Sequence, residues 1–473
     1  MSSAKTIRSS IFPAFILTTL LVGCTVGPDF KRPPPPEVAT YTSTPATLGE
    51  SQHFSENGLI NGQWWHELGS AKLNAFIEKA LQSNPTLAGA QATLRQADEL
   101  YAAQAGSSLY PQVGANVSAQ RQRTNPAVLG QSGDAREFSL YNTSVGVQYT
   151  FDLVGGTRRA LESLAAKVDY QGFQLEGARL TLTANLVITA ITQARLDAQI
   201  QATEAILYSQ EEQLALTRER ERLGQAAPDD VLALQTQVEQ TRAGIPLLRN
   251  HLQQNEHLLA VLAGRVPGAG GVPSFTLEEF TLPADLPLIV PSVLVRTRPD
   301  IKAAEALLHA ANADYGVAIA QLYPQLTLSA DLGSQALTTG TLFDSDSAVW
   351  SMVGQLTQPL FNPGLPAQKR AALAAFDAAA ANYRTVVLES LRNVADVLRA
   401  LDNDAQRLTA LTAADAAAQS SLESIQRQYT LGAVGYVNLL TAQQQAHLVR
   451  ITMIEAQAQR LINSAAFYQA MGG

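Results

Sequence analysis

The sequence predicts an α+β membrane protein built from two tandem structural repeats, each with two β-strands and a long antiparallel pair of helices. Three observations predict this fold. One sequence pattern occurs twice along the 473 residues. Four segments of about ten residues alternate apolar and polar side chains, and long segments rich in Ala, Gln and Leu carry apolar residues at heptad spacing.

Residues 1–23 are predicted to be a lipoprotein signal peptide. Lys5 and Arg8 precede an apolar stretch, Ile11 to Val22, that is too short for a membrane-spanning helix of about 20 residues but suits the apolar region of a secretory signal. It ends in LVGC, which resembles the bacterial lipobox and predicts lipidation of Cys24. The alternative is a free cysteine in a signal that is discarded. Thr25 follows instead of Asp, which by resemblance to sorting rules favours the outer membrane.

Residues 24–60 are predicted to form a lipidated, extended N-terminal strap that lies over other structure. The run from Pro33 to Pro36 prefers polyproline geometry and excludes a helix. A flexible tether is the alternative. Because stable attachment to a bilayer usually takes a second signal beside one lipidated residue, a second membrane element is expected.

Two pairs of matching strings divide the remaining chain into repeats. LYPQV at Leu109–Val113 recurs as LYPQL at Leu322–Leu326, and LGQAAPDDVLALQTQ, which begins at Leu223, aligns with LGAVGYVNLLTAQQQ, which begins at Leu431. The first repeat is predicted over 61–264 and the second over 299–473. The residues between them, 265–298, are rich in Gly and Pro and predict an irregular equatorial connector with a short strand.

Each repeat contains two segments that alternate with period two. The four predicted strands cover about 110–121, 139–152, 325–334 and 348–358. A soluble sandwich is the alternative, but the strand length and the aromatic ends at Tyr149, Phe151 and Trp350 favour transmembrane strands. Four strands cannot close a barrel with a lumen, and lipid does not tolerate open sheet edges. Several chains are therefore expected to share one barrel.

The other long segments are predicted to be antiparallel coiled-coil hairpins. Their apolar residues follow heptad steps, and the segment from about Ala367 to Tyr429 would be roughly 90 Å long if fully helical. Glycines break the hairpins at predicted turns over 223–230 and 431–437. Gly244 and Pro246 are expected to interrupt or kink the second helix.

Composition excludes several functions. The 33 Lys and Arg against 41 Asp and Glu give a net charge of −8, which does not favour nucleic acid. One cysteine cannot form an internal disulfide or a thiolate metal centre. The six histidines lack metal-binding spacing and no catalytic string occurs, so neither an enzyme, a cofactor nor a bound metal is predicted. Four scattered Met residues favour organic solutes over copper or silver as cargo.

Several strings resemble the outer membrane factor family of TolC-like channels, most of all its NodT-type lipoprotein branch. They are CTVGPDFKRP, WWHELGSAKL, the PSVLVRTRPDIKAAEALLHAANADYGVAIAQLYPQLTL string from Pro291, and the two turn motifs that begin with LG. The chain departs from the family at Thr297, where Arg is common, and at Val293, where Asp is frequent. The resemblance implies a homotrimer in which three chains share a 12-stranded outer-membrane β-barrel, continued by a periplasmic α-helical barrel.

The resemblance also implies a gate and a docking surface. Asp230 matches the acidic position that narrows TolC-like channels at their periplasmic end, and Asn438 stands at the corresponding place in the second repeat, where the family often has an acid. A structural role at a helix start is the alternative for Asp229 and Asp230. Glycines in the hairpin turns permit tight turns, and neighbouring apolar residues offer an adaptor-docking surface. These docking residues are Leu223, Gly224, Leu431, Gly432 and Val434.

The function expected from these features is that of an outer-membrane, lipid-anchored exit duct that spans into the periplasm. Its implied partners are a periplasmic adaptor (membrane fusion) protein, an inner-membrane RND-type pump and outer-membrane lipid. The alternative is a periplasmic coiled-coil adaptor or scaffold lipoprotein without a pore. A lipid-anchored enzyme is a third hypothesis that no residue constellation supports.

Overall fold

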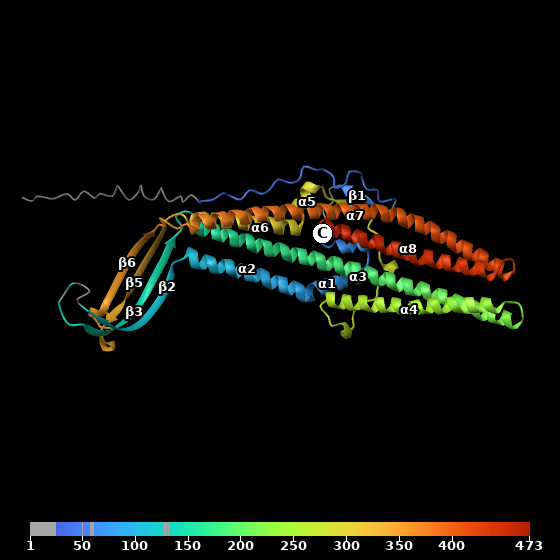
Figure 1. Ribbon diagram of the computed structural model, residues 1–473, viewed down its shortest axis with the longest axis horizontal. Helices are drawn as coiled ribbons and strands as arrows, with labels where there is room; N and C mark the ends of the chain where they lie inside the picture. The colour runs from blue at the N-terminus through green and yellow to red at the C-terminus, as the bar shows by residue number, and fades with distance from the viewer. Residues whose placement is uncertain (1–24, 50, 57–60, 126–129, 131) are drawn as a thin grey trace, which may run out of the picture. The chain divides into compact units, whose positions relative to one another are not determined.

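The computed structural model describes residues 25–473 except 50, 57–60, 126–129 and 131 (Figure 1). The signal peptide predicted at 1–23 and the lipidation site predicted at Cys24 therefore lie outside the described residues. The chain divides into two compact units, each of which draws on both halves of the sequence. The first consists of Met1–Pro33, Thr93–Gln171 and Ala303–Tyr383, and the second of Pro34–Ala92, Gly172–Lys302 and Arg384–Gly473.

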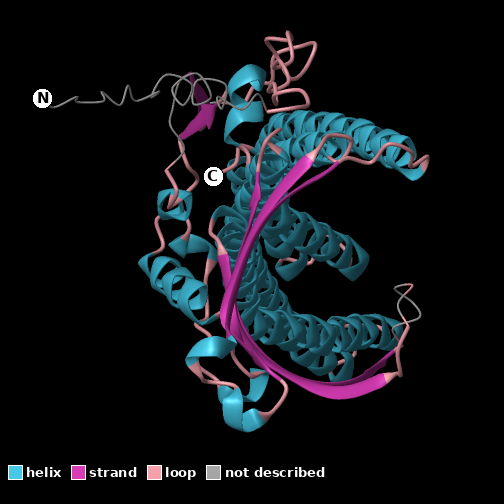
Figure 2. Cartoon of the chain, turned by 90° about the vertical axis from the view of Figure 1, so that its left-hand side faces the viewer, coloured by secondary structure: helices cyan, strands magenta, loops and turns pink. Residues whose placement is uncertain are grey.

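The first unit contains a four-stranded sheet in the order β2-β3-β5-β6. All neighbouring strands are antiparallel, and the sheet is strongly curved (Figure 2). β3 is the longest of the four, with 16 residues. The C-terminal ends of β2 and β5 and the N-terminal end of β3 extend beyond the predicted strands. The strands are β2 (Gln112–Thr124), β3 (Arg136–Phe151), β5 (Gln325–Ala336) and β6 (Ala348–Thr357).

The strand register aligns the period-two patterns of all four strands on common faces. Because side chains alternate across a strand, residues paired in register lie on the same face. Apolar residues fill two neighbouring rows, Val113-Val147-Ala330-Met352 and Ala115-Val145-Leu332-Trp350. Polar or small residues dominate the row between them, Gly114-Gly146-Asp331-Ser351.

The apolar face of this sheet is exposed within the chain. Val113 is 68% exposed and Trp350 is 79% exposed, where a soluble protein would bury them. Most of the other large side chains in these rows are also exposed: Val145, Val147, Leu332 and Met352. A continuous exposed apolar surface of this kind marks contact with lipid or protein.

Both edges of the sheet lack a neighbouring strand within the described residues. β2 pairs with β3, and β6 pairs with β5. Because the outer backbone N–H and C=O groups of an edge strand need hydrogen-bond partners, β2 and β6 can each pair with a further strand.

Two helical hairpins occur in the same order after the two strand pairs. The first consists of α3 (Gly156–Arg222) and α4 (Pro228–Leu262), and the second of α7 (Gly364–Thr430) and α8 (Tyr436–Ala470). α3 and α7 have 67 residues each, and α4 and α8 have 35 each. Among the described residues, none of the helices combines the length and apolar character that crossing a membrane requires.

α4 continues through Pro246 without a break, so the predicted interruption was wrong, while the predicted kink stays a prediction. Ile245 is 5% exposed and is part of the buried stripe of α4. Burial of that stripe provides a physical reason for the helix to continue despite the backbone hydrogen bond that proline cannot donate.

The second unit has an extensive hydrophobic core where the C-terminal ends of α4 and α8 lie against the middle of α3 and α7. Trp64 stacks on Tyr468 with ring centroids 5.3 Å apart, and both are buried in a cluster that also contains Leu186 and Leu259. The connector is more regular than predicted, since it contains β4 (Asp285–Leu288) and α5 (Pro291–Thr297). β4 pairs in parallel with β1 (His53–Glu56) of the strap.

Shorter elements complete the two units. Ser70 caps α1 (Ala71–Ser83) by accepting a hydrogen bond from the backbone N–H of Leu73. α2 precedes β2, and α6 precedes β5, which repeats the order of elements in the two halves. The remaining elements are η1 (Trp64–Leu68), α2 (Pro85–Leu109), η3 (Pro267–Ala269), η4 (Leu277–Glu279), α6 (Pro299–Ala320), η5 (Thr339–Thr341) and η6 (Ser345–Ser347).

Candidate functional site

The two hairpin turns have the same backbone geometry. Gly224 has φ = 73° and Gly432 has φ = 72°, a left-handed conformation that favours glycine. After α3, the N–H of Gln225 donates to the carbonyl of Arg220 at 2.7 Å. After α7, the N–H of Ala433 donates to the carbonyl of Gln428 at 2.8 Å. Both helices therefore end in a Schellman motif, which satisfies carbonyls that the helix leaves free.

Asp230 and Asn438 occupy equivalent positions after these turns. Each is the third residue of its helix, and its N–H donates to the carbonyl three residues earlier at 3.1 Å. Asp230 is half-buried and Asn438 is exposed. The carboxylate of Asp230 lies at a helix N-terminus, where the dipole stabilises negative charge.

A small apolar cluster joins the two hairpins near their turns. This inter-hairpin cluster consists of Leu214 from α3, Val231, Leu234 and Val238 from α4, and Tyr436 from α8. Tyr436 is 5% exposed. Burial raises its pKa, and neighbouring Tyr429 and Asp230 raise it further. Asp230 therefore lies close enough to Tyr436, the first residue of α8, for its charge to contribute to this shift.

The predicted docking residues differ in exposure. Leu223 is exposed and Leu431 is 83% exposed, whereas Val434 is half-buried. Val437 was missed by the sequence analysis although it is 69% exposed beside the same turn. Exposed apolar side chains at the ends of both hairpins form a surface suited to packing against another helical protein.

Polar contacts also join helices along the hairpins. Arg242 of α4 pairs with Glu211 of α3 at 2.6 Å, and Arg450 of α8 pairs with Asp415 of α7 at 3.1 Å. Between the hairpins, the Gln444 amide donates to Gln237 Oε1 at 2.8 Å. The Arg242–Glu211 pair is exposed, and an exposed pair contributes little stability on its own, whereas Asp415 is buried.

The strap residues that follow Cys24 are held in the first unit by a buried arginine. The Arg159 side chain is 4% exposed, and its guanidinium donates to the carbonyls of Val26 and Gly27. It also pairs with Asp29 and Glu162, both at 2.7 Å.

Backbone contacts place this part of the strap at the junction between β3 and α3. The N–H of Val26 donates to the carbonyl of Val154 at 2.9 Å, and Thr25 lies so close to Gly155 that a side chain there would clash. Asn312 of α6 donates to the carbonyl of Pro28 at 2.9 Å. The strap is therefore fixed where the sheet meets the helices of this unit.

Glu162 supports the same contact. Burial alone would raise its pKa, but hydrogen bonds from Arg159 and His309 outweigh that effect and lower the pKa below the ordinary 4.5. The His309 ring also stacks on Phe30 of the strap, with centroids 4.4 Å apart. The sequence analysis missed Arg159 and Glu162 because Asp29, which pairs with Arg159, and His309, which bonds Glu162, each lie more than 100 residues away along the chain.

No group of three or more His, Cys, Asp or Glu residues that could hold a metal ion occurs in the described part of the chain. The described residues instead form a sheet with an exposed apolar face, a strap held at its start by Arg159, and two helical hairpins that meet near their turns. An exposed apolar sheet face of this kind is suited to contact with a membrane.

Comparison with known proteins points the same way. The family described as Outer membrane efflux protein matches residues 76–265 and 290–473. The pyoverdine export outer membrane protein OpmQ of Pseudomonas putida is 30% identical over 456 residues, which cover 92% of this chain and 95% of OpmQ. The toluene efflux pump outer membrane protein TtgC of Pseudomonas putida is 29% identical over 478 residues, with 99% and 96% covered. The solved outer-membrane channel OprN superposes with a TM-score of 0.86 at 28% identity, covering 95% of this chain and 99% of OprN.

Proposed function

Because the chain belongs to the outer membrane efflux protein family and is an outer-membrane efflux channel that extends into the periplasm, we propose that it forms the passive exit duct of a tripartite pump. An inner-membrane RND-type transporter supplies the driving force, and a periplasmic adaptor connects the two. Small molecules then leave through the lumen.

The exposed apolar face of the sheet is the observation that carries this proposal. Its rows of apolar side chains run across all four strands, so one face suits lipid and the other suits water. The edges at β2 and β6 must pair with strands of other copies, because unpaired edges are not tolerated in lipid. Three copies of the sheet give the 12-stranded barrel of a homotrimer.

The repeated order of elements supports a tube of six hairpins. Each chain provides two tandem repeats, 61–264 and 299–473, joined by the connector at 265–298, and both hairpins have the same helix lengths. Three chains then give a periplasmic α-helical barrel with pseudo-sixfold walls.

Lipidation of Cys24 anchors the chain at the inner face of the outer membrane. Cleavage of the signal peptide at 1–23 exposes Cys24 as the new N-terminus of the strap, 24–60. Arg159 and Val154 hold the residues directly after it at the junction of sheet and helices. The acyl chains then enter the leaflet beside the barrel, which is the second membrane element.

The hairpin turns at 223–230 and 431–437 close the periplasmic end. Asp230 lines the constriction, and Asn438 takes the equivalent place without charge. Leu223, Gly224, Leu431, Gly432 and Val434 form the surface that docks the adaptor.

The proposal is tested on the full-length protein purified from outer membranes in a mild detergent. Light scattering should give the mass of three chains, heating in SDS should convert a compact band into monomer, and reconstitution should give discrete conductance steps in planar bilayers. A monomer that never conducts would instead identify a scaffold lipoprotein without a pore.

A further inference from the structure

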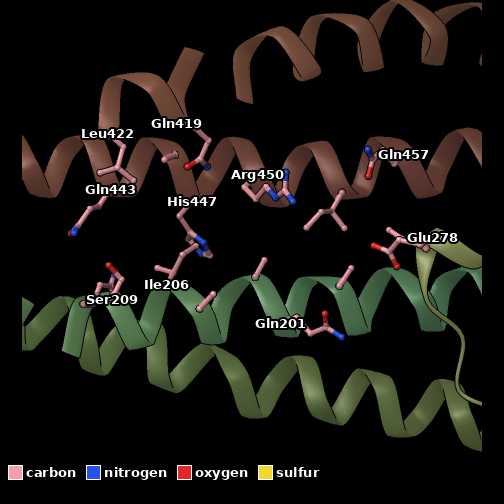
Figure 3. Close-up of a pocket in the computed structure, with 17 residues that line it drawn as sticks. Gln201, Ile206, Ser209, Glu278, Gln419, Leu422, Gln443, His447, Arg450 and Gln457 are labelled. Carbon is pink, nitrogen blue, oxygen red and sulfur yellow. The ribbon is translucent and has the colours of Figure 1, made fainter. Parts of the chain in front are cut away.

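A cavity of about 390 Å³ lies between α3 and the second hairpin of the same chain. In Figure 3 the side chains of Gln443 and His447 extend from α8 toward α3, and Glu278 of the connector lies at the other end. Three parts of the second unit therefore meet at this cavity: the first hairpin, the second hairpin and the connector.

The wall combines apolar and unsatisfied polar groups. Its apolar part includes Ala202, Ile206 and Leu422. Gln210 is 2% exposed and Gln443 is 8% exposed, and in the described part of the chain the Oε1 atom of neither has a hydrogen-bond partner. A buried amide oxygen that accepts no hydrogen bond is costly. Both side chains are therefore able to bond a ligand in the cavity.

The Nδ1 atom of His447 is likewise without a partner among the described residues. Burial lowers the pKa of His447, so its ring is neutral and can donate or accept according to its tautomer. His447 stands one helical turn from Gln443 on α8, which places both on one face. This end of the cavity is thus polar but uncharged.

The opposite end carries negative charge. Burial raises the pKa of Asp197, and the charges of Glu278 and Glu204 raise it further, as expected for carboxylates that lie near one another. Asp197 holds Gln201, a wall residue, through a 2.7 Å hydrogen bond. The positive charge of Arg450 in the wall is balanced by Asp415 at 3.1 Å.

We propose that this cavity binds an amphipathic organic cation. Its ammonium group lies near Glu278 and Gln201, its apolar body packs between α3 and α8, and Gln210 or Gln443 bonds a polar group at its far end. An anion would be repelled at the Glu278 end, and a purely apolar ligand would leave the two buried amide oxygens without a hydrogen-bond donor. This site goes beyond the proposed duct, because it lies between hairpins of one chain and its occupancy ties them together.

The test uses the purified full-length protein in non-ionic detergent and three matched probes that carry a phenol at the far end: 4-(4-hydroxyphenyl)butylammonium, 4-(4-hydroxyphenyl)butanol and 4-(4-hydroxyphenyl)butanoate. Isothermal titration should show saturable binding of the ammonium probe at one site per chain, at least tenfold weaker binding of the alcohol, and no binding of the carboxylate. Equal binding of ammonium and alcohol, or no saturable binding, would overturn the proposal.

Two variants locate the site. Glu278→Gln should weaken binding of the ammonium probe about fivefold, which is the effect of removing one partly exposed charge pair. The control is Glu423→Gln, which changes an exposed residue of α7 outside the cavity and should leave the affinity unchanged. Ala202→Phe should abolish binding by filling the cavity, and elution as the same oligomer will show that it folds. Equal affinities in Glu278→Gln and Glu423→Gln would contradict the assignment. Because binding is measured without transport, failure here leaves the conductance test of the duct unaffected.

Discussion

Asp230 and Asn438 occupy the same position in two different helices. The backbone N–H of each donates to the carbonyl three residues earlier at 3.1 Å, and each stands third in the helix that follows a glycine turn. In a trimer the two positions would give a ring that carries three carboxylates and three amides. Such a ring attracts cations.

Asp230→Asn should therefore lower the preference of the channel for K⁺ over Cl⁻ by about twofold or more, because it removes the three carboxylates from the lumen. Asn438→Asp should raise the preference for K⁺ over Cl⁻. Reversal potentials in a KCl gradient across a planar bilayer measure both. Asp229→Asn, its exposed neighbour, is the matched control. An unchanged reversal potential in Asp230→Asn would return that residue to a purely structural role at the helix start.

The second prediction concerns the two faces of the sheet and compares substitutions at two adjacent residues of β6. Met352 lies on the apolar face and Ser351 on the polar face, and both are exposed within the chain. Met352→Arg should destabilise the protein in lipid vesicles by about 2–4 kcal/mol if it falls near the bilayer midplane, whereas Ser351→Arg should be tolerated. Urea titrations in lipid vesicles compare the two. Equal costs would indicate a sheet with water on both sides.

The third prediction concerns the hydrogen bonds by which Arg159 holds the strap. Arg159→Leu removes charged hydrogen bonds to the Val26 and Gly27 carbonyls and to Asp29, so it should lower the hydrogen-exchange protection of the Val26 amide by about 1.5–3 kcal/mol. Lys167→Leu is the control, because Lys167 of α3 pairs with Asp314 of α6 at 3.2 Å. Unchanged protection of Val26 in Arg159→Leu would show that other contacts hold the strap.

The same contact depends on pH through Glu162. Its folded pKa is lowered from 4.5, so its contribution is fully present above that value and is lost as the pH falls through the folded pKa. Exchange protection of the Val26 amide should therefore be constant near neutral pH and weaken only below about pH 4.5. Glu162→Gln should remove this acid-dependent step. Its persistence in that variant would assign the step to another carboxylate.

The lipid anchor is tested at Cys24. Cys24→Ser should abolish incorporation of labelled fatty acid, yet some trimer should remain in the outer membrane because the shared barrel is itself an anchor. Membrane fractionation gives the second readout. Label on the variant protein would contradict the assignment of Cys24, the single cysteine of the chain.

The sequence predicts the strands and hairpins well because their periods are regular. Alternation at Val145 and Leu332 shows which side chains share a face, but it does not show that these two residues are paired in register. Tyr436 was missed because it follows a glycine turn, where no local signal shows that it joins the inter-hairpin cluster. Arg159 was missed for the same reason, since a buried cation is recognised only through partners that the fold brings near it.

The central claim is that the chain forms a duct closed by its hairpins, and it is tested most directly by linking them. Gln237 and Gln444 bond to each other across the hairpins, so cysteines at both positions can be joined by a short, reducible bifunctional methanethiosulfonate. The linked trimer should stay in a low-conductance state in a planar bilayer, and reduction should restore conductance to the level of the same variant labelled with a monofunctional reagent. Equal conductance before and after reduction would contradict the account.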